Sequence, residues 1–365
     1  MNNYILEIPK KVPLERNFAT NINPLGPPKW VFKYLKENSI DITSYPELWH
    51  QRCDEMVARI LGVDSDCHIT IPGTSEFFSQ LPSLFNFNQD EVKNQKWAAF
   101  KPTFWEYSLV AKLNNIEFYE FPLDYKKPKD FFDIEKLISF IHQVKPNLFF
   151  LCSPNNPTGH ALPLELINRL SDEFPNMIII LDLTYAYFEK NFYEYLSLIN
   201  VNSKNIIAVI SYSKFFCLPG LRIGSVIFPT ADISEIYRKI SGPLRLNIFS
   251  EKLLPLLLSD DDYINSTKSF FYNEWDFIIK TIKDENLEWY CPVNDSSCFR
   301  TFISKENHKS LNYSSFVAKS LYDSWGIRVC DGKFYGLEDA IRIRAGTRDA
   351  NLKLIEALKN LKSLN

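Results

Sequence analysis

A lysine follows a short apolar run in the middle of the chain, and groups suited to a phosphate lie close to it in sequence. Residues 206–211 read Ile-Ile-Ala-Val-Ile-Ser, a pattern typical of a strand buried in a parallel sheet. Ser211 and Ser213 precede Lys214, and Arg222 follows after a Pro-Gly pair. A lysine at the end of a buried strand is poorly hydrated, which favours its neutral, nucleophilic form. Hydroxyl groups and a guanidinium suit a phosphate dianion.

These features together predict a site for a cofactor that carries both a carbonyl group and a phosphate. Pyridoxal 5′-phosphate (PLP) is such a cofactor. If only the Ser-x-Ser-Lys pattern were present, a surface lysine after an ordinary strand would be the better interpretation. The sequence Pro-Gly-Leu-Arg-Ile-Gly at residues 219–224 favours the cofactor site instead.

The segment from Ser211 to Gly224 resembles the lysine segment of fold-type I PLP enzymes, in the aminotransferase class I/II family. The resemblance covers almost the whole chain. Two branches are most similar, the histidinol-phosphate aminotransferases and the L-threonine-O-3-phosphate decarboxylases of cobalamin biosynthesis. The family implies an α/β fold, with a large domain built on a mostly parallel sheet flanked by helices and a smaller α+β domain.

The order of the predicted elements agrees with this architecture. Strands alternate with helices through the first two-thirds of the chain, which predicts a parallel sheet with ligand groups at its strand ends. We expect an N-terminal arm (1–30) that packs with the small domain, a large PLP-binding domain (31–243) and a small C-terminal domain (244–365).

Three residues are expected to carry the chemistry: Lys214, Asp182 and Tyr185. Asp182 ends the apolar run that starts at Met177, and a buried aspartate is unfavourable unless it is paired. The resemblance makes the pyridinium nitrogen of PLP its partner. Tyr185 and Asn156, from the turn Asn-Pro-Thr-Gly, are expected at the O3′ oxygen of the cofactor. The residues after Asp182 are Leu-Thr rather than the Glu-Ala of the aminotransferases, which weakens a specific assignment to histidinol phosphate.

Further contacts with the cofactor are predicted around its phosphate and its ring. Gly73, Thr74 and Ser75 lie in a turn between a predicted strand and a helix, and Thr74 or Ser75 is expected to cap that helix, whose N–H groups then face an anion. The resemblance implies that Phe104 stacks on the ring, although a place in the core is an equally good interpretation of one Phe. Tyr45 matches a tyrosine that reaches the neighbouring subunit's phosphate, which implies a homodimer with shared sites. A place at the rim is the alternative for Tyr45.

The substrate is expected to contact residues from both ends of the chain. By resemblance these are Asn23, Gly26, Asn156, Arg328 and Arg342. Arg342 matches the carboxylate-binding arginine of the family, and a planar guanidinium fits a carboxylate well. Cys330 occupies the position of a family arginine that helps to bind anionic groups. Arg328 lies two residues earlier on the same strand face, and Lys333 is another possible substitute.

Composition excludes several other classes of protein. The chain has 365 residues, 45% of them hydrophobic and 23% charged, so a large core is expected and disorder is not. A net charge of −3 without a basic block argues against nucleic acid as a partner. No apolar run is long enough to span a membrane, and no signal sequence is recognised. The seven scattered cysteines suggest reduced thiols in the cytoplasm, and the five histidines lack metal-binding spacing, so no metal is expected.

The favoured function is PLP-dependent decarboxylation of L-threonine or L-serine O-phosphate to the phosphorylated amino alcohol, for cobamide biosynthesis. The forms Pro-Leu-Gly-Pro in the arm and Lys-Phe-Phe after residue 213 are nearer to the decarboxylase branch. A histidinol-phosphate-type aminotransferase is the alternative, because the two reactions differ only in which bond to Cα stands perpendicular to the ring. A non-catalytic module is a third hypothesis, and the intact Lys214, Asp182 and Arg222 argue against it.

Overall fold

The computed structural model describes residues 12–86, 95–128, 131–201, 204–293, 297–305 and 312–361, apart from the side chains of residues 86, 200 and 201. Seven strands form a large sheet in the order β1-β7-β6-β5-β4-β2-β3. Their bounds are β1 His68–Ile71, β2 Lys96–Lys101, β3 Glu117–Pro122, β4 Leu148–Cys152, β5 Ile178–Asp182, β6 Ile206–Ser211 and β7 Gly224–Ile227. Only β7 runs antiparallel to its neighbours, β1 and β6. The predicted fold class, with its mostly parallel sheet, is therefore confirmed.

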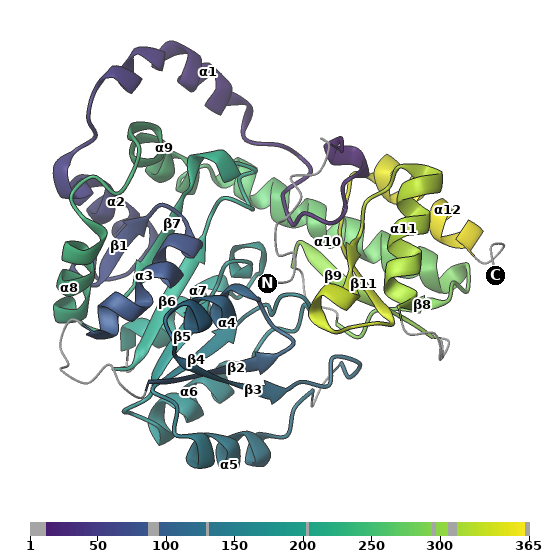
Figure 1. The fold of residues 1–365 in the computed structure, drawn as a ribbon. Helices are drawn as coiled ribbons and strands as arrows, with labels where there is room; N and C mark the ends of the chain where they lie inside the picture. The colour runs from purple at the N-terminus through teal and green to yellow at the C-terminus, as the bar shows by residue number, and fades with distance from the viewer. Residues whose placement is uncertain are drawn as a thin grey trace.

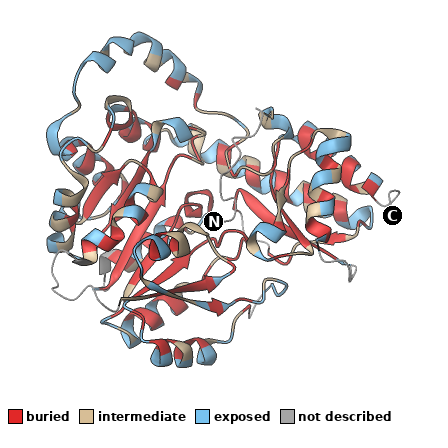
Figure 2. Cartoon of the chain, viewed as in Figure 1, coloured by how far each residue is buried: buried red, intermediate tan, exposed pale blue. Residues whose placement is uncertain are grey.

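Helices cover this sheet, and its central strands are buried on both faces (Figures 1 and 2). Successive side chains of β5 point into different apolar clusters, Ile179 and Leu181 into one and Ile180 into the other. The bounds of the helices in this part of the chain are α1 Lys29–Glu37, α2 Gln51–Leu61, α3 Thr74–Asn86, α4 Glu106–Leu113, α5 Ile134–Val144, α6 Leu164–Glu173, α7 Phe192–Val201, α8 Ala231–Ser241 and α9 Ile248–Leu258. The apolar runs read from the sequence are thus buried strands, as expected.

The helical stretch that connects the two sheets is divided into two helices. α9 packs against α2, and α10 (Asp261–Asp284) then packs against α12 (Arg348–Asn360) of the second, smaller sheet domain. The division falls at Ser259 and Asp260, and the Asp260 carboxylate caps α10 by accepting the N–H of Tyr263 at 3.1 Å.

The smaller sheet has the strand order β10-β11-β9-β8, and all of its pairs are antiparallel. Its elements are β8 Trp289–Tyr290, β9 Phe299–Ser304, α11 Tyr313–Trp325, β10 Cys330–Asp331, β11 Ala340–Arg344 and α12 Arg348–Asn360. Thr347 is the N-cap of α12, and Asp349 lies within the first turn of this helix. Within the described ranges, no helix combines the length and apolar character needed to cross a membrane.

One buried arginine fastens the described part of the N-terminal arm to the smaller sheet. The Arg344 side chain is inaccessible to solvent and donates to the carbonyl oxygens of Leu14, Asn17 (3.1 Å) and Ala345 (2.8 Å). Its backbone N–H donates to the carbonyl of Phe18 at 3.0 Å. These hydrogen bonds fix the arm to the smaller sheet before the chain continues to the larger sheet.

Candidate active site

The carboxyl ends of β4, β5 and β6 lie side by side and place polar groups at one edge of the large sheet. Cys152 at the end of β4 is directly opposite Asp182 at the end of β5. The turns that follow these strands contribute Asn156, Thr184 and Lys214 to a cavity of about 130 Å³. Its lining residues are Thr74, Ser75, Phe104, Cys152, Asn156, Asp182, Thr184, Tyr185, Ser211, Ser213, Lys214 and Arg222. The structure thus brings together ten of the twelve residues predicted to bind the cofactor, all except Gly73 and Tyr45.

Lys214 lines this cavity, and its amine has no partner among the described residues. The turn that carries it is tied to the next strand, because the Ser213 hydroxyl exchanges hydrogen bonds with the backbone N–H and C=O of Ile223 (both 3.3 Å). In the described part of the chain, the Lys214 side chain has neither a hydrogen bond nor an ion pair. Burial lowers the pKa of its ammonium group; the Cys298 thiol opposes this, and two nearby arginines lower the pKa further. The direction agrees with the expected nucleophilic lysine.

Asp182 is a buried carboxylate held only by neutral donors. Its Oδ1 accepts the backbone N–H of Thr184 at 2.9 Å, and its Oδ2 accepts the phenol O–H of Tyr107 at 2.5 Å. Burial raises the pKa of Asp182, and the hydrogen bonds from Thr184 and Tyr107 lower it in part. No cation pairs with this carboxylate among the described residues. A protonated ring nitrogen would supply the missing positive charge.

Gly73 and Arg222 form a close contact, and Arg222 lines the cavity. Arg222 has a left-handed backbone (φ +53°), and its Nη2 lies 2.5 Å from the point where a Cβ on Gly73 would stand. α3 begins at Thr74, so Thr74 and Ser75 lie inside its first turn, and the prediction that either caps the helix is wrong. The first N–H groups of α3 and the guanidinium form a cradle suited to an anion. The Ser75 hydroxyl donates to Oε2 of Glu106 at 2.8 Å.

Asn156 and Tyr185 are connected to the arm and to the smaller sheet. Arg342 on β11 donates from Nη1 to Oδ1 of Asn156, and from Nη2 to the carbonyl of Ala19 at 2.9 Å. The Tyr185 hydroxyl accepts from Nδ2 of Asn21 at 3.1 Å. The arm and both sheets therefore meet at the mouth of the cavity. Phe104, predicted to stack on the ring, lines the wall of the cavity.

Two arginines of the smaller domain each keep an unused buried N–H group. Nε of Arg342 is buried and has no hydrogen-bond partner within the described ranges. Nη1 of Arg328 is likewise buried and unpartnered in that part of the chain. Cys330 lies directly opposite Arg342 in the β10–β11 pairing, and Arg328 precedes Cys330 by two positions.

Asn23, Gly26 and Tyr45 do not line the cavity. The amide Nδ2 of Asn23 donates to Phe215 O and Tyr263 OH, both at 2.9 Å, and Asn23 N–H donates to Lys214 O at 3.0 Å. The carbonyl of Gly26 accepts from the same tyrosine hydroxyl at 2.6 Å. Asn23 and Gly26 hold the arm against the lysine segment, whereas Tyr45 is 85% exposed. Their binding roles remain predictions.

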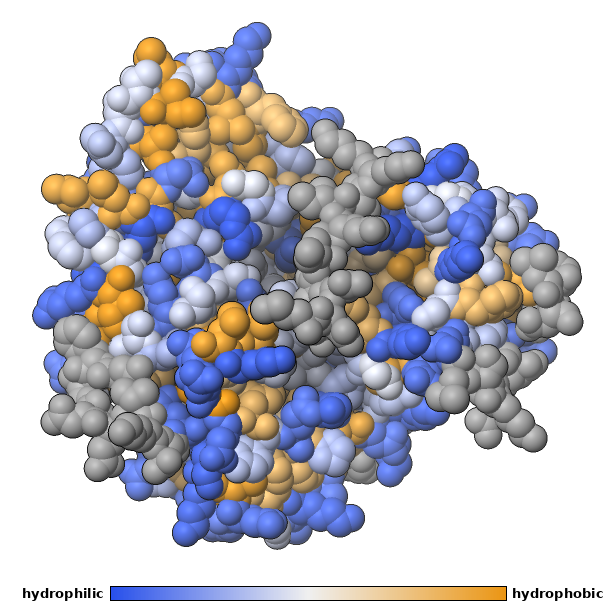
Figure 3. All heavy atoms as spheres, in the orientation of Figure 1, coloured by the Kyte–Doolittle hydropathy of each residue, from blue (hydrophilic) through white to orange (hydrophobic). Residues whose placement is uncertain are grey.

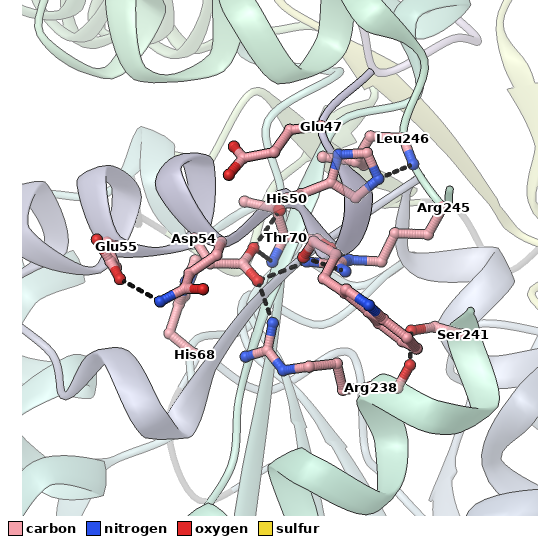
Figure 4. A network of polar contacts seen from close by, with 12 residues as sticks. Glu47, His50, Asp54, Glu55, His68, Thr70, Arg238, Ser241, Arg245 and Leu246 are labelled. Atoms are coloured by element: carbon pink, nitrogen blue, oxygen red, sulfur yellow. Dashed lines mark hydrogen bonds and ion pairs between the residues drawn. The ribbon is translucent and has the colours of Figure 1, made fainter. Parts of the chain in front are cut away.

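Arg245, in the segment after α8, does not line the cavity. Figure 4 shows it among the residues around Asp54. It donates to Oδ2 of Asp54 at 2.5 Å and to the carbonyls of Thr70 (2.7 Å) and Trp49 (2.9 Å). This network ties the segment after α8 to α2 and β1. Asn247 has a local role, because its side chain caps α9.

The sequence analysis missed several groups that contact the predicted site residues. Tyr107 and Glu106 are the most important, because they bond to Asp182 and Ser75 from adjacent positions on α4. Thr184 and Cys152 also line the cavity.

The three ends of this cavity fit the three functional groups of PLP. The unpaired Lys214 amine suits an aldehyde, the Asp182 carboxylate suits a protonated ring nitrogen, and the Gly73–Arg222 cradle suits a phosphate. Among the described residues, no group of three or more His, Cys, Asp or Glu could hold a metal ion. The donor set is that of an organic cofactor.

Comparison with known sequences identifies the family. The family model for aminotransferase class I and II matches residues 16–358, and the chain belongs to this PLP-dependent family. A putative threonine-phosphate decarboxylase of Caldanaerobacter subterraneus subsp. tengcongensis is 27% identical over 349 residues, 94% of this chain and 89% of the relative. A histidinol-phosphate aminotransferase of Francisella philomiragia is 27% identical over 325 residues, 87% of this chain and 84% of the relative.

Solved structures agree on the fold. The histidinol-phosphate aminotransferase of Clostridium acetobutylicum has a TM-score of 0.83 at 22% identity, covering 96% of this chain and 99% of its own. The L-threonine-O-3-phosphate decarboxylase of Porphyromonas gingivalis has a TM-score of 0.76 at 22% identity, covering 95% and 99%. The aminotransferase of Sinorhizobium meliloti, solved with PLP, has a TM-score of 0.82 at 19% identity, covering 96% and 91%. Both branches named from the sequence share the architecture.

Proposed function

We propose that this protein is a PLP-dependent decarboxylase of an O-phosphorylated amino acid, L-threonine or L-serine O-phosphate. The product is the phosphorylated amino alcohol, a building block for cobamide biosynthesis. The similarity to the putative threonine-phosphate decarboxylase of Caldanaerobacter supports this branch. Leu183 and Thr184 after Asp182, in place of the aminotransferase residues, support it as well.

The observation that carries the proposal is the pair of unused N–H groups on Arg342 and Arg328. A buried guanidinium N–H without an acceptor is unfavourable, so each favours a ligand oxygen. An O-phosphorylated amino acid carries a carboxylate and a phosphate on one small molecule. We assign the substrate's carboxylate to Arg342, beside Asn156, and its phosphate to Arg328. In this assignment Arg328 takes the role of the family arginine whose position Cys330 occupies.

Within this reaction the residues of the chain have distinct roles. Lys214, with its lowered pKa, provides the amine that binds the cofactor and later returns a proton to Cα. Asp182 would hold the proton on the ring nitrogen of bound PLP, and Tyr185 and Asn156 would orient its ring oxygen. The cofactor would supply an acceptor for the electron pair left at Cα when CO₂ departs.

A histidinol-phosphate-type aminotransferase is the second candidate, supported by the Francisella relative and by the TM-score of 0.83. One assay separates the two. The protein with PLP is incubated with O-phosphothreonine or O-phosphoserine without any 2-oxo acid, and CO₂ is measured. Release of CO₂ is expected. Turnover only with histidinol phosphate and 2-oxoglutarate would refute decarboxylation.

The role of Arg328 has a matched control in Lys333, an exposed lysine that bonds to Asn312. Arg328→Met should raise the KM for the phosphorylated substrate at least tenfold, because a charge-assisted contact to phosphate is lost. Lys333→Met should change the KM less than twofold. Equal effects of both variants, or none, would contradict the assignment of the phosphate to Arg328.

We also propose that two copies of the chain form a dimer with shared active sites. α1 stands in an arch away from the main body (Figure 1), and hydrophobic side chains gather over this region at the upper left of Figure 3. Large exposed apolar residues on this surface are Phe32 (63%), Ile40 (72%), Ile42 (73%), Tyr45 (85%) and Leu48 (62%). A surface of this kind favours burial against a partner. The seven cysteines form no disulfide within the described ranges, which suits the cytoplasm.

Complementation between two inactive variants tests the shared site. Tyr45→Ala and Lys214→Ala are each expected to be nearly inactive. In a mixed dimer, the Lys214→Ala subunit supplies Tyr45 to the intact Lys214 of the other subunit, so activity should return after subunit exchange. Light scattering reports the mass independently. A dimer without recovered activity would refute the shared site, and a monomer would refute the dimer.

A further inference from the structure

Tyr107 is fixed beside Asp182 by the packing of its ring. It lies in the first turn of α4, is inaccessible to solvent, and donates to Oδ2 of Asp182 at 2.5 Å. Its ring stacks on Phe150 with centroids 4.3 Å apart and planes 7° apart, and Phe78 meets it edge-on at 5.2 Å. The ring has no room to swing away, so the hydroxyl stays on the carboxylate.

Hydrogen bonds from Thr184 and Tyr107 offset the burial of Asp182 in part. Thr184 acts through its side chain and through its backbone N–H, and no side-chain substitution removes the latter. In an apolar surrounding, a carboxylate stays ionised only when donors or cations stabilise it. The phenol of Tyr107 is therefore a neutral donor to this carboxylate that a single conservative substitution, Tyr107→Phe, removes.

Other titratable groups face the same carboxylate. Burial raises the pKa values of Tyr107 and Cys152, so both remain neutral at neutral pH. Glu106, half-buried, also interacts with Asp182, and burial raises its pKa too. Lys214 and Arg222 lie along the same cavity. Any pH test must separate Asp182 from these neighbours.

We infer that Tyr107 is a positioning residue: its phenol keeps the Asp182 carboxylate ionised and oriented, with a free lone pair directed to the cofactor's ring nitrogen. It touches neither the substrate nor the reacting bond. The inference rests on the role proposed for Asp182, but it holds for decarboxylation and for transamination alike. The inference gives Tyr107 a function distinct from that of Phe104, which lies three residues earlier.

The first test uses cofactor-free protein and thermal unfolding. Tyr107→Phe removes the donor and should raise the pKa of Asp182. Because a carboxyl group with a raised folded-state pKa loses stability as the pH rises through that pKa, the variant should be destabilised more at pH 8 than at pH 5. We expect the difference in Tm between wild type and Tyr107→Phe to be about 2 °C larger at pH 8 than at pH 5. When Tyr107→Phe is introduced into the Asp182→Asn variant, the effect on Tm should no longer depend on pH.

Tyr195→Phe is the matched control, because Tyr195 is also fully buried and bonds through its hydroxyl to Ser153 at 2.9 Å. Its deficit in Tm should be the same at both pH values. A Tyr107→Phe deficit that is independent of pH, or that persists in the Asp182→Asn background, would overturn the inference. A purely structural role for Tyr107 predicts that result.

The second test follows the visible absorbance of bound PLP against pH. Tyr107→Phe should shift the apparent pKa of the cofactor band by at least about half a unit, whereas Tyr195→Phe should leave it unchanged. An unshifted band in Tyr107→Phe would overturn the inference. If Asp182→Asn also left the band unshifted, the fault would lie in the role proposed for Asp182, since its charge then would not reach the cofactor.

Discussion

Nη2 of Arg222 lies 2.5 Å from the position that a Cβ on Gly73 would occupy. The two residues come from the turns next to α3 and β7, and their contact closes the end of the cavity that suits a phosphate. Gly73 also has a φ of +87°, which side chains rarely tolerate. The backbone geometry thus requires glycine at this position, and a methyl group there would push the Arg222 guanidinium aside.

Gly73→Ala should therefore weaken PLP binding by at least about tenfold, or 1.4 kcal/mol, because the new methyl group displaces the guanidinium. Titration of cofactor-free protein with PLP measures the effect. Gly336→Ala is the control: Gly336 has a φ of +78°, but its Cβ would meet no atom within 4 Å. An equal loss of affinity in both variants would mean that backbone strain alone is responsible.

Glu106 should make cofactor binding depend on pH. Burial raises the pKa of this carboxyl group, so its neutral form persists to higher pH than usual, and ionisation places a negative charge beside the phosphate cradle. PLP affinity should fall as the pH rises through this pKa, and Glu106→Gln should remove much of the fall. Glu76→Gln, an exposed change on the same first turn of α3, controls for net charge. Parallel pH profiles for both variants would be evidence against this role.

The main site residues could be predicted because local sequence fixes their positions. Asp182 and Lys214 follow apolar runs, and the carboxyl ends of parallel strands meet at one edge of a sheet. The turn that carries Asn156 has a specific sequence. For these residues, the strand and its turn determine the location without knowledge of the remaining packing.

Other contacts depend on how distant elements pack, and the sequence does not contain that information in readable form. Glu106 and Tyr107 reach Ser75 and Asp182 because α4 docks with its first turn against the strand ends. Arg245 turns to Asp54 because α2 lies beside the segment after α8. Thr74 does not cap α3 as predicted, because α3 starts at Thr74 itself, whereas a capping residue precedes the first helical residue.

Arg344 should be essential for holding the arm. Burial lowers the pKa of this guanidinium to about 10, so it stays charged at neutral pH while it binds three backbone carbonyls. Arg344→Met removes the guanidinium donors to Leu14 and Asn17, and the Leu14 carbonyl keeps only the local N–H of Asn17, so the arm should detach and trypsin should cleave after Arg16 or Lys29. We expect a stability loss of about 2 kcal/mol or more.

Limited proteolysis with mass spectrometry measures detachment of the arm, and Arg169→Met supplies the comparison. Arg169 is a surface residue that pairs with Glu135 and Glu173, so its loss should cost less than about 1 kcal/mol and leave the arm protected. If the arm of Arg344→Met were as resistant to trypsin as that of Arg169→Met, the contacts of Arg344 would not be what holds it.

His68 should make the folded protein sensitive to acid. It is fully buried on β1, its Nε2 lies 2.9 Å from the Ser225 hydroxyl, and burial lowers its pKa to about 4. Because the unfolded chain binds the proton more readily, the stabilisation is complete above the unfolded pKa of about 6.5 and is lost as the pH falls towards 4. The loss at pH 5.5 should be about 1 kcal/mol.

His68→Asn removes this titration while it keeps a polar group that can bond to Ser225. The variant is expected to be less stable at pH 7.5, since it loses packing, but its stability should fall less steeply between pH 7 and pH 5. His142→Asn, at an exposed histidine, should keep the wild-type slope. Denaturation curves of cofactor-free protein at several pH values measure the slopes. If His68→Asn kept the same steep slope, another group would be responsible for the acid sensitivity. The buried His50, whose pKa is also lowered by burial, would be the next candidate.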